Sequence, residues 1–73
     1  MSSQSAQQSQ PAANAKAEHH TQAAECAIKA ATEHGEAAKA STAGDHKKAD
    51  EHAKNAETHG LKAAEHAKLA KAA

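Results

Sequence analysis

Small apolar residues recur at a spacing of three and four along most of the chain. In the second half they are Ala49, Ala53, Ala56, Gly60, Ala63, Ala67 and Ala70. In the first half the same spacing gives Ala17, Thr21, Ala24, Ile28, Ala31, Gly35 and Ala38. Residues so spaced share one stripe of an α-helix, as do the a and d positions of a coiled coil. The pattern predicts two helices that pack along a seam of small side chains, with their axes about 8 Å apart.

One interruption, at residues 41–45, separates the two helical stretches. Gly44 suits the left-handed residue that ends a helix, and Asp45 suits the N-cap of the next helix. Asn14 is expected to cap the first helix. Residues 1–13 are rich in Ser and Gln and contain Pro11, so we expect a disordered polar leader. The predicted fold is all-α: an antiparallel two-helix hairpin over residues 14–73, with helices at about 14–42 and 46–71.

The short turn also predicts which residues face each other across the seam. The bulky Ile28 is expected opposite Gly60, where a large side chain meets a small one. Two exposed ion pairs, Lys39–Asp50 and Glu18–Lys71, fit the same register. The expected small-residue pairs are Ala38–Ala49, Ala31–Ala56, Ala24–Ala63 and Ala17–Ala70.

Composition narrows the classes of function. The chain has no Phe, Tyr or Trp, and its nine basic side chains balance nine acidic ones, which argues against a nucleic-acid partner. It has no apolar run long enough to span a membrane and no recognisable signal peptide. A core made mostly of alanine cannot enclose the dry, shaped cavity that an enzyme needs. We therefore expect a small protein that is not an enzyme.

Histidine is the unusual feature, with seven residues in a chain of 73. His52, His59 and His66 are seven apart, and in the expected heptad they share the g position with His20 and His34. The predicted register pairs His34 with His52 and His20 with His66, and it puts His59 opposite Ala27. Neutral imidazole is a common ligand of copper(II), nickel(II) and zinc(II), so these facing pairs predict metal binding. The candidate ligands are His19, His20, His34, His46, His52, His59, His66 and Asp50.

Other side chains have supporting roles in this interpretation. His46 and Asp50, four residues apart, could share an ion near the turn. Glu33, Glu51 and Glu65 each precede a histidine and are expected to balance charge or orient the ligands rather than bind the ion. Cys26, the one cysteine, is expected at an outward f position. There a disulfide between two chains could join two hairpins into a four-helix bundle.

The segments "EHGEAAKA", "DHKKADEHAKNAETHG" and "LKAAEHAK" resemble the repeats of the small metal-binding protein family. The resemblance covers about residues 18 to 70. It implies a periplasmic helical bundle that binds copper(II), nickel(II) and other divalent ions through histidine and carboxylate side chains. The family has a four-helix unit, whereas this chain has two predicted helices and also carries Cys26.

The expected function is that of a metal buffer or scavenger in metal homeostasis or resistance. A second interpretation is a stress or desiccation protein that resembles the late embryogenesis abundant class, based on the composition of "KAATEHGEAAKASTAG". The heptad position of the histidines separates the two interpretations, because a stress protein has no use for imidazoles that are paired across a seam. A third, an ice-binding helix, rests only on the eleven-residue spacing of Thr21 and Thr32, which Thr42 breaks.

Overall fold

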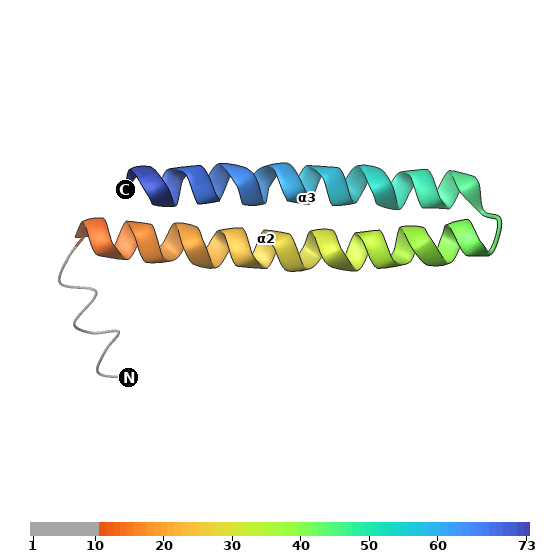
Figure 1. Ribbon diagram of the computed structural model, residues 1–73, viewed down its shortest axis with the longest axis horizontal. Coiled ribbons are helices and arrows are strands. Elements are labelled where there is room, and N and C mark those ends of the chain that lie inside the picture. The colour runs from red at the N-terminus through yellow and green to blue at the C-terminus, as the bar shows by residue number, and fades with distance from the viewer. Residues whose placement is uncertain (1–10) are drawn as a thin grey trace, which may run out of the picture.

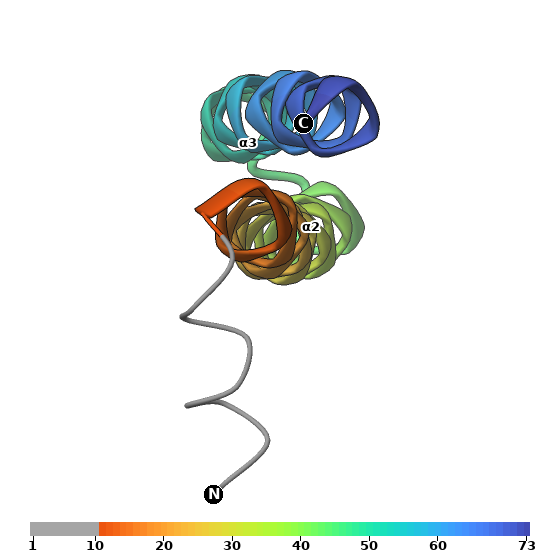
Figure 2. The same cartoon turned by 90° about the vertical axis from the view of Figure 1, so that its left-hand side faces the viewer.

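The chain folds into two long antiparallel helices joined by a tight turn (Figure 1). The computed structural model describes residues 11–73, so most of the predicted leader, residues 1–13, lies outside the described part. Helix α2 comprises Pro11–Thr42 and helix α3 comprises His46–Ala72. Seen along their axes, the two helices pack as one pair (Figure 2). The predicted all-α helical hairpin is confirmed.

Helix α2 begins at Pro11, three residues before the predicted start. Proline is favoured in the first turn of a helix, because its fixed φ suits the helix and its missing N–H would have no partner there. Asn14 therefore lies inside the first turn, and the prediction that it caps the helix is wrong. The alanine-rich sequence that follows is a strong helix former, which explains the unbroken run to Thr42.

The turn between the helices is a Schellman motif. The Gly44 N–H donates to the Ser41 carbonyl at 3.0 Å, and the Asp45 N–H donates to the Ala40 carbonyl at 2.8 Å. Gly44 has a φ of 84°, in the left-handed region that favours glycine. The Asp45 carboxylate then accepts a hydrogen bond from the Lys48 N–H at 3.1 Å and so caps α3. The roles predicted for Gly44 and Asp45 are both confirmed.

The seam between the helices is built mainly from alanine. Its most buried residues are Ala30, Ala40, Ala56 and Ala70, each at most 9% exposed. The α3 side agrees well with prediction, because Ala49, Ala56, Ala63 and Ala70 are all buried or half-buried. Ala53 and Ala67, also predicted on that side, are exposed.

The face of α2 that packs on α3 differs from the prediction. All seven predicted seam residues of α2, from Ala17 to Ala38, are exposed, and Ile28 is 65% exposed. The buried and half-buried positions from residue 19 onward are His19, Ala23, Cys26, Ala30, Glu33, Ala37 and Ala40. This set is the predicted one moved by two residues, which turns a helix by about 200°.

Two physical reasons favour the observed face of α2. The β-branched side chain of Ile28 would hold the helices apart, whereas Ala30 lets them approach closely. The half-buried imidazoles of α3 also need polar partners, because an unpaired polar group costs free energy when it leaves water. The observed face offers His19 and Glu33 for this purpose, in contact with His66 and His52.

The two ion pairs predicted along one flank of the seam are also not formed. Lys39 pairs with Glu36 of its own helix at 3.6 Å, and neither Lys39–Asp50 nor Glu18–Lys71 is an ion pair of the structure. Neither Gly35 nor Gly60 has another atom within 4 Å of where a Cβ would be, so neither is needed for close packing within the hairpin. Over residues 11–73, neither helix has an apolar stretch long enough to cross a membrane.

Candidate functional site

Two histidines meet across the seam near the open end of the hairpin. The Nδ1 atoms of His19 and His66 lie 3.2 Å apart, and the ring centroids are separated by 5.4 Å with 28° between the ring planes. This distance is that of a hydrogen bond in which one ring is protonated at Nδ1 and donates to the Nδ1 lone pair of the other. Both residues are half-buried. We call this contact the His–His pair.

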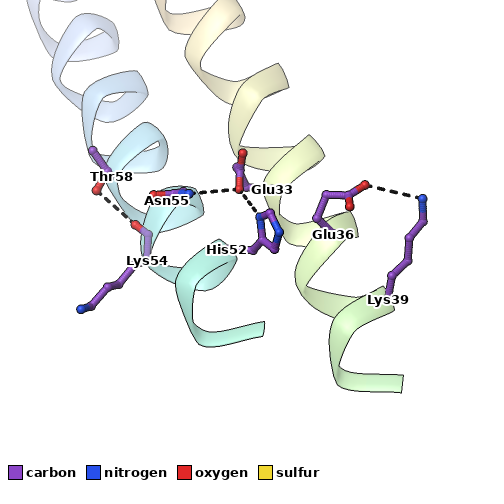
Figure 3. A network of polar contacts seen from close by, with 7 residues as sticks. All are labelled: Glu33, Glu36, Lys39, His52, Lys54, Asn55 and Thr58. Carbon is purple, nitrogen blue, oxygen red and sulfur yellow. Dashed lines mark hydrogen bonds and ion pairs between the residues drawn. The ribbon is translucent and has the colours of Figure 1, made fainter. Parts of the chain in front are cut away.

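A histidine and a carboxylate meet across the seam near the turn, as Figure 3 shows. The Nδ1 atom of His52 lies 2.7 Å from Oε1 of Glu33, and both side chains are about three-quarters buried. The Asn55 amide also donates to Oε1 of Glu33, at 3.4 Å. The hydrogen bond from His52 is the main reason that the pKa of Glu33 lies below its usual range. We call this contact the Glu–His pair.

The Glu–His pair fixes the orientation of the His52 ring. Because the Glu33 carboxylate can only accept, Nδ1 of His52 carries the proton of this hydrogen bond. In the neutral ring the lone pair then belongs to Nε2, the nitrogen that remains free to bind a metal ion. A carboxylate behind a ligating histidine is the usual support of such sites. The partner of Glu33 is thus His52 of the other helix and not its sequence neighbour His34.

A groove near the turn, with a volume of about 270 Å³, reaches His52 of the Glu–His pair. It is lined by Glu36, Lys39, Ala40, Ala43, Asp45, Lys48 and His52. Its lining includes two acidic and two lysine side chains, so the groove does not favour one sign of charge strongly.

A third pair follows from the register of the first two. Cys26 is seven residues after His19 and seven before Glu33, while His59 is seven after His52 and seven before His66. Cys26 therefore lies opposite His59, midway between the two contacts above, and both residues are half-buried. We call these two residues the Cys–His pair. The prediction that Cys26 points outward is wrong, because it lies on the packed face of α2.

Layers of alanine alternate with these three pairs. Ala23 and Ala63 lie between the His–His and Cys–His pairs, and Ala30 and Ala56 lie between the Cys–His and Glu–His pairs. Successive pairs are seven residues apart, or about 10.5 Å along the axis. At that distance two neighbouring pairs cannot share an ion.

The predicted histidine pairs are wrong by one residue in α2. His66 contacts His19 rather than His20, and His52 contacts Glu33 rather than His34. His20 and His34 are exposed, as are His46 and Asp50, which were expected to share an ion. Adjacent residues differ by about 100° around a helix, so the turned face of α2 replaces each predicted partner with its neighbour.

The sequence contained a signal for the observed pairs. Residues able to bind metal recur every seven positions on both helices, as His19, Cys26 and Glu33 on α2 and as His52, His59 and His66 on α3. Within the described residues, no group of three or more His, Cys, Asp or Glu side chains surrounds a common point. No pair therefore offers more than two protein donors to one ion.

A scan against protein-family models found no match, and searches of curated proteins and of solved structures also found none. The geometry of the seam is thus the main guide to what the chain does.

Proposed function

We propose that the chain binds divalent transition-metal ions, namely copper(II), nickel(II) and zinc(II), and acts as a metal buffer or scavenger. The observation that carries the proposal is the 3.2 Å separation of Nδ1 of His19 and Nδ1 of His66. Two nitrogens about 2.05 Å from one ion lie roughly 2.9 Å apart at a right angle and roughly 3.3 Å apart in a tetrahedron. The His–His pair already has the spacing of two ligands of one ion.

Binding at the His–His pair needs a tautomer change and a small turn of both rings. The ring that donates from Nδ1 moves its proton to Nε2, and both Nδ1 lone pairs then face the ion after the rings turn about χ2. Both imidazoles stay neutral, which is the state that ligates. The remaining coordination positions go to water, so the ion is held by two protein atoms and exchanges readily. Such exchange suits a buffer and does not require an enclosed site.

His52 is proposed as a second binding position, through Nε2, because the Glu33 carboxylate increases the basicity of the ring. The resemblance to the periplasmic metal-binding family supports the same class of function and a periplasmic location. Cell fractionation with an antibody against the chain would test the location.

The function is tested by titrating nickel(II) and zinc(II) into the chain while histidine ring resonances are followed by NMR. His19→Ala should weaken binding roughly tenfold or more, whereas His20→Ala, on the exposed neighbour, should change it less than about twofold. The two variants remove the same group from adjacent positions of one helix. Equal effects of the two variants would refute the His–His site. Absence of saturable binding to the wild type would refute the function and favour the stress-protein interpretation.

A further inference from the structure

The Cys–His pair has a donor set that differs from the other two. Cys26 brings a thiol and His59 brings an imidazole, and the register of the hairpin sets them opposite each other from two different helices. A thiolate is a soft ligand, and soft ligands select copper(I), zinc(II) or iron–sulfur clusters. The pair therefore differs in metal preference from the all-imidazole His–His pair.

The layers on either side decide how many protein ligands an ion can have at this point. On the side of the turn they are Ala30, 9% exposed, and Ala56, 1% exposed, and on the other side they are the half-buried Ala23 and Ala63. Alanine side chains have no donor atom, and no third His, Cys, Asp or Glu joins the pair in the described part of the chain. An ion at this layer has two protein ligands.

Coordination number then separates the candidate metals. Structural zinc sites use four protein ligands, and iron–sulfur clusters are held by several cysteines, so two donors suit neither. Copper(I) has a filled d shell and forms stable two-coordinate complexes with one sulfur and one nitrogen ligand. We propose that Sγ of Cys26 and a ring nitrogen of His59 form a two-coordinate copper(I) site between the Ala23/Ala63 and Ala30/Ala56 layers.

The binding step is a ligand exchange without redox chemistry. The Cys26 thiol releases its proton to solvent as the copper–sulfur bond forms, and the neutral His59 ring donates a lone pair. Copper enters and stays as copper(I). This inference rests on the proposed metal-binding role of the seam, and it assigns the two oxidation states of copper to different pairs, copper(II) to His19/His66 and copper(I) to Cys26/His59.

The test is an anaerobic titration of the full chain with copper(I), followed by its absorption spectrum, and a separate competition with a chromogenic copper(I) chelator for the affinity. The chain has no Phe, Tyr or Trp, so a thiolate-to-copper absorption band in the near ultraviolet is unobscured. The wild type should bind one copper(I) per chain and show this band. Cys26→Ser should remove the band, and His59→Ala should weaken binding roughly tenfold or more. His34→Ala, which removes an exposed imidazole, should bind as the wild type does.

A matched control moves the thiol off the seam. The double variant Cys26→Ala with Ala24→Cys keeps one cysteine on α2 but puts it at an exposed position with no histidine opposite. It should keep full helicity by circular dichroism and bind copper(I) roughly tenfold or more weaker than the wild type. Equal affinity of this variant and the wild type, or no effect of His59→Ala, would overturn the proposal. Two chains per copper would overturn it as well.

Failure of the copper(I) proposal can be distinguished from failure of the proposed divalent-metal function. Nickel(II) binding at His19/His66 is measured in the same Cys26→Ser variant, which keeps both histidines. Normal nickel(II) binding without a wild-type copper(I) site refutes only the copper(I) proposal. If the wild type does not bind nickel(II), the proposed metal-binding function is refuted, whether or not the chain binds copper(I).

Discussion

Replacing Ala30 with leucine should destabilise the hairpin much more than the same change at the next residue. Ala30 is 9% exposed and faces Ala56, which is 1% exposed, so an added isopropyl group has no space between the helices. Overpacking of this kind typically costs about 1–3 kcal/mol. Ala31 is exposed, and leucine is nearly as good a helix former as alanine, so Ala31→Leu should stay within about 0.5 kcal/mol of the wild type.

Thermal melting by circular dichroism measures the difference. For a chain of this size, 1 kcal/mol corresponds to about 4–8 °C, so Ala30→Leu should lower the Tm by at least about 4 °C. Helices that separate lose their packed face and become marginal in water, so undocking reduces the helical signal. If Ala31→Leu were the more damaging variant, α2 would pack through the Ala17–Ala38 stripe, and the three cross-helix pairs described here would not form.

Three further predictions concern the turn, the Glu–His pair and the metal. Asp45→Ala removes the N-cap of α3 and should destabilise the hairpin by about 1 kcal/mol, or about 4–8 °C in Tm. Asp50→Ala, on the exposed face, should lower the Tm little, and thermal melts of the two variants test the difference. The pKa of Glu33 is lowered from its ordinary 4.5, so its stabilising effect is complete above about pH 4.5 and is lost as the pH falls through the lower folded value. The Tm difference between the wild type and Glu33→Gln should therefore shrink below pH 4.5, and a constant difference would contradict the pairing with His52. Nickel(II) at a hundredfold excess over its Kd should stabilise the wild type by about 2.7 kcal/mol, and His19→Ala clearly less, as measured by thermal melting. Near pH 5 the ion should be released, so the stabilisation should disappear from the melt.

The turn and the two helix ends that flank it could be predicted because local chemistry determines them. Gly44 and Asp45 are each suited to one backbone role, and those roles do not depend on how the helices pack. The register was predicted to within one residue for a similar reason, since a turn this short leaves little freedom in how the chain returns. Ala31 was expected opposite Ala56, and the residue found there is Ala30.

The packed face of α2 could not be predicted from spacing alone, because alanine recurs on two stripes of that helix. Ala17, Ala24, Ala31 and Ala38 form one, and Ala23, Ala30 and Ala37 form the other. The hydrophobic pattern favoured the stripe with Ile28. The partners required by the half-buried histidines of α3 favoured the other stripe, and this requirement appears only when both helices are considered together. His19, Cys26 and Glu33 follow from that second criterion.

The common seven-residue period of the two helices has a consequence for folding fidelity. Sliding α3 by two helical turns would again set alanine against alanine, but it would bring His59 to His19 and His52 to Cys26. The seam by itself is therefore nearly degenerate between registers. The Schellman motif at Gly44 and the cap at Asp45 select one of them, because they fix the length of chain between the helices. Which side chains of the two helices share a layer is thus decided by a few turn residues that lie outside the seam.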